Sequence, residues 1–107
     1  MLLIALADEP RHGYALIQEV AQISDGRVKL RAGTLYGALD RLLQQGVVCV
    51  EREEVVDGRA RRVYALTEQG REELSAEAAR LRAVALEAER RMTAKGLPGV
   101  RVAGVTA

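Results

Sequence analysis

Two short runs of basic residues are the groups in this sequence best suited to bind a charged partner. The runs are Arg27, Lys29 and Arg31, and then Arg59, Arg61 and Arg62. Guanidinium and ammonium groups bind phosphate oxygens through charge-assisted hydrogen bonds. Because the net charge of the whole chain is only +1, binding to nucleic acid would have to rely on such local clusters. Pairing with Glu53 and Glu54 is the alternative role for the second run.

Three predicted helices precede the second basic run. An apolar segment over residues 2–6 predicts the first helix, and apolar residues at helical spacing over 14–24 predict the second. The third is expected over 34–45, with Thr34 as its N-cap and Gly46 as its left-handed C-cap. One side of this third helix is apolar and the other is polar, so we expect the polar side to face outward.

A change to β-branched residues over 47–56 predicts a strand after the third helix. The Asp-Gly dipeptide at 57–58 predicts a tight hairpin turn, and 61–66 supplies the returning strand. Thr67 is expected to cap a last helix that runs to about Lys95.

Three helices followed by a hairpin are the element order of a winged helix-turn-helix, in which the third helix enters the major groove of DNA. The predicted fold class is α+β, mainly α. Residues 1–66 are expected to form the DNA-binding domain and 67–95 a C-terminal dimerisation helix. The tail, 96–107, is expected to be disordered.

Several side chains are placed where such a fold would contact a duplex. Tyr36 can donate its hydroxyl to a phosphate, and Gly37 either lets the backbone approach DNA or packs against another helix. His12 is either a phosphate contact or a helix cap, and Arg41 either binds guanine or is held by Asp40. The predicted DNA-binding residues are His12, Tyr14, Arg31, Thr34, Tyr36, Gly37, Arg41, Arg59, Arg61 and Arg62.

Apolar residues of the last helix recur at the alternating spacing of a helix-helix seam. They are Leu74, Ala78, Leu81, Ala85, Ala88 and Met92. Pairing with a second chain, to which Leu3 would contribute, and packing on the chain's own first helix are both expected. A symmetric dimer would place two third helices about one DNA turn apart, so its operator should be an inverted repeat.

Other functional classes find little support in the sequence. Cys49 has no second cysteine with which to form a disulfide and no histidine nearby for a metal site, so it is expected to be a buried apolar residue, and no cofactor is expected. No apolar run approaches the roughly 20 residues that cross a bilayer, which predicts a cytoplasmic protein. No nucleophile is paired with a base, so an enzyme is not expected. A winged-helix module that binds another protein remains the alternative.

The sequence resembles the PadR family of transcriptional regulators, in particular the short subfamily with one C-terminal dimerisation helix. The matching motifs are His12-Gly13-Tyr14, Gly33-Thr34-Leu35-Tyr36, Ala38-Leu39, Arg41-Leu42, Arg61-Arg62-Val63-Tyr64 and Leu66-Thr67-Glu68-Gln69-Gly70. The resemblance implies a dimer joined by the last helix, repression by occupying an operator, and release by a small molecule, often a phenolic compound or a hydrophobic drug. It also implies that Tyr36 and its neighbours enter the major groove while the hairpin contacts the DNA backbone. The family usually has proline where this chain has Gly37.

Overall fold

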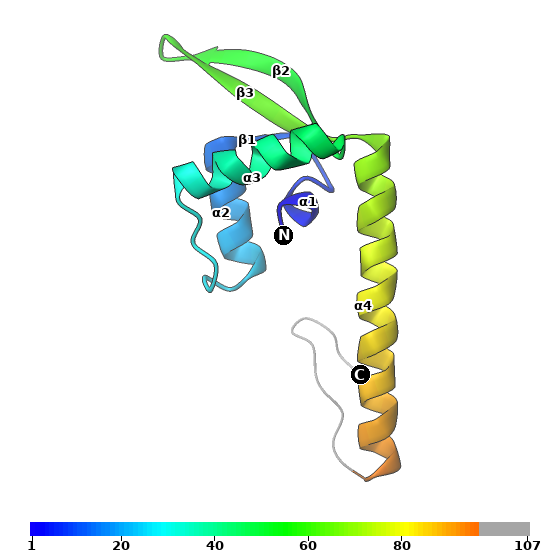
Figure 1. The fold of residues 1–107 in the computed structure, drawn as a ribbon. Helices are drawn as coiled ribbons and strands as arrows, with labels where there is room; N and C mark the ends of the chain where they lie inside the picture. Colours follow the sequence, from blue (N-terminus) through cyan, green and yellow to red (C-terminus); the bar gives the residue numbers. More distant parts are fainter. Residues whose placement is uncertain (97–107) are drawn as a thin grey trace. The chain divides into compact units, whose positions relative to one another are not determined.

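The computed structural model describes residues 1–96 (Figure 1). These residues belong to two compact units, of which the first is Met1–Leu74 and the second begins at Ser75. The predicted tail, 96–107, lies outside the described residues apart from Gly96. Among the described residues, no helix is both long enough and apolar enough to cross a membrane.

The first unit contains three helices and a small antiparallel sheet, as the sequence predicts. Its elements are α1 (Leu2–Ala5), β1 (Arg11–His12), α2 (Gly13–Ile23), α3 (Ala32–Gln45), β2 (Val48–Val56) and β3 (Arg59–Leu66). The strands lie in the order β1-β3-β2. The two-residue strand β1, which the sequence did not predict, pairs with β3 through Arg11 opposite Tyr64 and His12 opposite Val63. The winged helix-turn-helix prediction is confirmed.

The core lies between α2, α3 and the base of the hairpin, and it is built almost entirely from aliphatic side chains. Its buried members are Ala5, Leu6, Leu16, Val20, Leu35, Leu39, Val47, Val48, Tyr64 and Leu66. Leu35 and Leu39, on the inner side of α3, are completely buried. The polar side of this helix therefore faces outward. Cys49, predicted to be buried, is only half-buried, because it alternates with Val48 and so lies on the side of the sheet away from the core.

The predicted start of the third helix is wrong. The helix begins at Ala32, and its N-cap residue is Arg31 in an extended conformation with no side-chain cap. The Leu35 amide donates to the Arg31 carbonyl at 2.9 Å, so the first helical turn forms without a hydroxyl cap. Thr34 therefore lies inside the first turn of α3, exposed, rather than at its cap. Ala32 is a strong helix former and extends the helix backwards.

The predicted turns are confirmed. Gly46 ends α3 in the left-handed region with a φ of 78°. Asp57 and Gly58 both have positive φ, at 53° and 76°, which is the geometry of the two-residue turn that suits the twist of a hairpin. The β2–β3 hairpin, which we call the wing, extends beyond the core as in Figure 1.

The helix α4 (Glu68–Ala94) is capped as predicted. The Thr67 hydroxyl accepts a hydrogen bond from the Gly70 amide at 3.0 Å and donates to the Gly46 carbonyl at 2.6 Å. Gly70 is buried, and a methyl group added to it would clash with the carbonyl oxygen of Val47, just before β2. Thr67 and Gly70 therefore fix the beginning of α4 to the corner between α3 and β2.

The predicted seam of the last helix divides between the two units. Leu74 and Leu3 both pack against the core of the first unit. In the second unit Leu81 is 59% exposed, while Ala78, Ala85 and Ala88 are exposed and Met92 is half-buried. Ion pairs one turn apart, such as Arg91 with Glu87 at 2.8 Å, support the helix in this unit.

Candidate nucleic-acid interface

Tyr36 projects from the outer side of α3 and lies directly over the beginning of α2. Tyr36 is 47% exposed. A methyl group placed on Gly13 would lie 2.5 Å from the Tyr36 hydroxyl oxygen and 3.0 Å from the carbon that bears it. Only a glycine leaves room for the phenol in this position. The sequence placed Gly13 in a motif but gave no reason for it, because the contact joins residues from different helices.

A second tyrosine, Tyr64, lies in the core of the first unit. Tyr64 of β3 is 3% exposed, and burial raises the pKa of its phenol. The charge of Arg62 acts in the opposite direction, while Tyr36 and Asp40 raise the pKa of Tyr64 further. With its pKa raised in this way, the Tyr64 phenol is neutral at physiological pH.

Gly37 follows Tyr36 on α3 and has open space in front of it. Apart from its two chain neighbours and the nearby backbone of α3 itself, no atom of residues 1–96 lies within 4 Å of the position that a methyl group would occupy there. The alternative explanation for Gly37, close packing against another helix of the same chain, is therefore not supported within residues 1–96. A surface of this kind permits close approach of another molecule to the helix backbone.

His12 caps α2, which is one of the two alternatives that the sequence left open. Its Nδ1 accepts a hydrogen bond from the Ala15 amide at 3.3 Å. Burial lowers the pKa of His12, Arg61 lowers it further, and Glu54 opposes the shift. A neutral imidazole that accepts through Nδ1 carries its proton on Nε2, which leaves one donor for another partner. Tyr14, in the first turn of α2, is 66% exposed.

The wing separates the three arginines that the sequence grouped. Arg61 lies opposite Glu54, and Arg62 lies opposite Glu53. Because successive strand residues point to opposite sides, Arg61 and Arg62 lie on different faces of the wing. The predicted cross-strand pairing is present in both cases, at 3.3 Å for Arg61 with Glu54 and at 3.7 Å for Arg62 with Glu53. Arg59, next to the turn, has no ion pair among residues 1–96.

Arg52 joins Arg61 on the same face, although the sequence did not single it out. Its guanidinium donates to one oxygen of Glu54 at 2.9 Å, while Arg61 donates to the other oxygen at 3.3 Å. Hydrogen bonding from Arg52 is the largest cause of the lowered pKa of Glu54. The pairing register is irregular between Val50 and Arg52, and such a bulge reverses the alternation of side chains. Between Arg52 and the turn the register is regular, so Arg52, two residues before Glu54, lies on the face of Glu54 and Arg61 by ordinary alternation.

The first basic run and Arg41 lie on the surface of the first unit. Arg27, Lys29 and Arg31 are exposed. None of these three residues, nor Arg41, forms an ion pair with any described residue. The alternative in which Asp40 holds Arg41 is therefore not observed.

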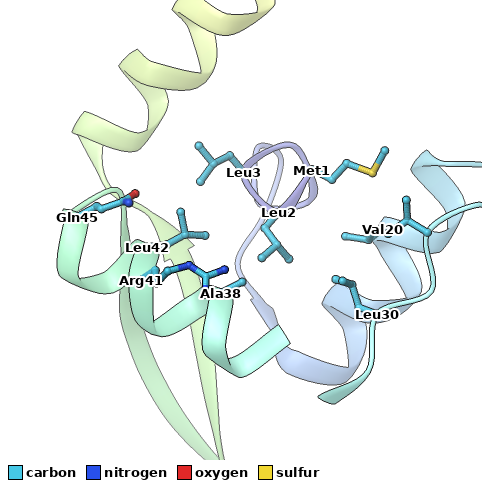
Figure 2. A pocket seen from close by; sticks show the side chains of 10 residues that line it. Met1, Leu2, Leu3, Val20, Leu30, Ala38, Arg41, Leu42 and Gln45 are labelled. Atoms are coloured by element: carbon cyan, nitrogen blue, oxygen red, sulfur yellow. The ribbon is translucent and has the colours of Figure 1, made fainter. Parts of the chain in front are cut away.

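Arg41 borders an open cavity of about 390 Å³ between α1, α2 and α3 (Figure 2). Apolar side chains make most of its wall, and Arg41 and Gln45 of α3 are the polar residues that line it. The lining residues are Met1, Leu2, Leu3, Val20, Val28, Leu30, Ala38, Arg41, Leu42 and Gln45. Any molecule in this cavity would touch α3. The sequence named no residues for a small-molecule site.

Known proteins resemble this chain in both sequence and fold. Transcriptional regulator Rv3488 of Mycobacterium tuberculosis is 41% identical over 81 residues, which are 76% of this chain and 72% of that protein. A PadR-like transcriptional regulator from Bacillus cereus has the same fold, with a TM-score of 0.70, 20% identity, and coverage of 85% of this chain and 86% of that one. PadR of Bacillus subtilis, solved in complex with operator DNA, has a TM-score of 0.62 and 19% identity over 72% of this chain and 46% of that chain.

A match to a protein family is stronger evidence for the classification of this chain than these individual similarities. The family described as "Transcriptional regulator PadR-like family" matches residues 2–76. This range covers the first unit except Met1 and includes the residues of α2, α3 and the wing described above. The chain therefore belongs to the PadR-like family of transcriptional regulators.

Proposed function

We propose that this protein is a sequence-specific DNA-binding repressor that places α3 in the major groove. The observation that carries the proposal is the outer side of α3, where Tyr36 is held over Gly13 and Gly37 has open space before it. A helix with a hydrogen-bonding side chain and an uncovered backbone segment suits close contact with a duplex. The operator complex of the Bacillus subtilis protein, which has the same fold, gives further support.

The remaining predicted contacts are proposed to position the protein on the DNA backbone. Arg31 and the exposed basic residues before it would reach phosphates near the start of α3. Tyr14 and the Nε2 proton of His12 would reach phosphates near the start of α2, where free backbone amides also favour anions. Arg41 would donate to guanine from the next turn of α3, and Thr34 would contact the backbone beside Tyr36.

We propose that the wing contacts phosphates through its arginines. Arg59 is free to do so in the absence of DNA, whereas Arg61 and Arg62 would have to exchange glutamate partners for phosphates. These exchanges are feasible because exposed ion pairs contribute only about 0–1 kcal/mol. The proposal predicts that Arg61→Ala weakens binding to any duplex without unfolding the protein.

A homodimer joined through α4 completes the proposal. Leu81 and its alanine neighbours present an exposed apolar seam in the second unit, and pairing with a second copy would remove this surface from water. Leu74 and Leu3, which pack on the core of the first unit, would contribute at the edge of the interface. Two copies related by a twofold axis would bind an inverted repeat.

Release by a small-molecule effector is proposed to act through the cavity beside α3. The apolar lining and the single arginine suit a small, mostly apolar molecule, and a ligand there would contact α3 directly at Arg41 and Leu42. A ligand that binds better to a tilted α3 than to the DNA-bound arrangement would shift the protein away from DNA. The proposed place of action is the cytoplasm, where the operator would be found.

A protein-interaction module without DNA binding is the second candidate, because glutamates already neutralise two of the wing arginines. Salt dependence separates the two functions. Binding that neutralises about six phosphates should give a slope near −5 in a plot of log affinity against log salt. Fluorescence anisotropy with labelled duplexes between low and moderate salt measures this slope. A flat plot, together with unchanged affinity of Tyr36→Ala, would exclude the proposed interface.

A further inference from the structure

On the face of the wing that carries Glu54, two arginines bind one anionic group, the carboxylate of Glu54. We propose that Arg52 and Arg61 form a binding site for a DNA phosphodiester and that Glu54 occupies this site in the free protein. The inference rests on the proposed function. It assigns a role to Arg52, which the sequence did not single out, and to Glu54, which the sequence named only as a pairing partner of the wing arginines. Glu54 would thereby set how readily the wing binds any duplex.

The geometry shows two guanidinium groups converging on one carboxylate. Arg52 donates through Nε and Nη2 to one oxygen of Glu54, at 3.1 and 2.9 Å. Arg61 donates through Nε and Nη2 to the other oxygen, at 3.4 and 3.3 Å. A phosphodiester also presents two oxygens, and it accepts paired hydrogen bonds from arginine in the same way. The Glu54 carboxylate thus stands where a phosphate could be held.

All three side chains are accessible to a phosphate. The exposed fractions are 52% for Arg52, 40% for Arg61 and 30% for Glu54. Glu51 also contacts Arg52, at 3.3 Å, so the two arginines and two glutamates together carry no net charge. A neutral group attracts DNA weakly, and a carboxylate close to a phosphate repels it.

The other face of the wing provides a control from the same hairpin. Glu53 contacts Arg62 alone, at 3.7 Å, and no hydrogen bond joins them in the described chain. Replacing Glu53 or Glu54 by glutamine changes the net charge by the same amount. Only the replacement of Glu54 removes a carboxylate that two arginines share, although Arg52 keeps its contact with Glu51. The difference between the two variants therefore measures the proposed site separately from the general effect of charge.

The experiment compares wild type, Glu54→Gln and Glu53→Gln on a 25-base-pair duplex of arbitrary sequence, by fluorescence anisotropy between about 50 and 300 mM salt. Freeing up to two phosphate contacts should steepen the salt slope of Glu54→Gln by about one to two. Its Kd at the lowest salt should fall about fivefold or more, whereas Glu53→Gln should change Kd less than twofold. Adding Arg52→Gln to Glu54→Gln should reverse about one unit of the added slope.

The possible outcomes separate this inference from the proposed function. If wild type binds duplex but Glu54→Gln gains no more than Glu53→Gln, the phosphate site is excluded and the proposed function stands. If Glu54→Gln binds more weakly while its thermal unfolding is unchanged, Glu54 holds the arginines in place for DNA, which also overturns the inference. If no variant binds any duplex at any salt concentration, the proposed function and the inference fail together.

Discussion

Replacing Gly13 by alanine should disturb the proposed interface, although the added methyl group itself would not contact DNA. The added methyl group would lie 2.5 Å from the Tyr36 hydroxyl oxygen, which is about 0.9 Å closer than the 3.4 Å at which ordinary contacts begin. The methyl group would also lie 3.3 Å from a methyl carbon of Leu35, which is held in the core. Because Leu35 is fixed there, the end of the Tyr36 side chain is the part that must move. We therefore expect the phenol to swing away from its position over α2.

The size of the effect follows from the contact that would be lost. A hydrogen bond to a charged phosphate contributes about 1.5–3 kcal/mol, and about 1.4 kcal/mol corresponds to a tenfold change in Kd. The Kd for operator DNA should therefore rise at least about tenfold for each α3 helix that enters the duplex. Stability should change by less than about 1 kcal/mol, because the better helix propensity of alanine offsets the tighter contact.

A double-mutant cycle tests whether the loss passes through the tyrosine. Anisotropy titrations would compare Gly13→Ala, Tyr36→Phe and the double variant, with thermal unfolding as the check on folding. The hydroxyl is absent from Tyr36→Phe, so adding Gly13→Ala to it should change Kd little. Wild-type affinity for Gly13→Ala, or an equal additional loss in both backgrounds, would refute the proposed role of the Tyr36 hydroxyl.

Three further predictions follow from the other glycines and from the single histidine. Gly37→Ala should stabilise α3 by about 1 kcal/mol yet weaken binding to operator DNA, and calorimetry with anisotropy would show whether these effects are opposite in sign. Gly70→Ala should destabilise the fold by about 3 kcal/mol or more, since its methyl group would meet the Val47 carbonyl; Gly33→Ala, which meets nothing within 4 Å, should not, and equal denaturation midpoints would contradict this. The lowered pKa of His12 means that the folded state favours the neutral imidazole, so this contribution to stability is present above pH 6.5 and is lost as the pH falls through the folded pKa. His12→Gln should reduce the slope of unfolding free energy against pH in that window, and an unchanged slope would assign the pH dependence to other groups.

The elements that follow from local chemistry were predictable from the sequence. Gly46 and the Asp57-Gly58 turn adopt the left-handed conformations expected of them, because these positions are determined by the backbone of a few neighbouring residues. The Thr67 cap was recognised for the same reason. Thr34 misled the prediction, since a hydroxyl before an apolar run also occurs inside the first turn of a helix.

The features that depend on contacts between distant residues were not predictable in the same way. The contact of Tyr36 with Gly13 joins two helices, and neither residue alone indicates it. Arg52 of β2 and Arg61 of β3 lie on one face of the wing and converge on Glu54, a contact between side chains that the types of these residues alone do not indicate. The predicted basic cluster of the wing was therefore correct in its residue types but divided between two faces.

Selection of bound fragments from random duplex DNA tests the central claim most directly, because it examines sequence recognition and symmetry together. We expect an enriched inverted repeat whose half-sites lie about one helical turn apart. Tyr36→Ala should lose the enrichment while remaining folded. Recovery of no enriched sequence from a folded wild-type protein, or of the same sequence with Tyr36→Ala, would contradict the claim that α3 reads DNA through the surface around Tyr36.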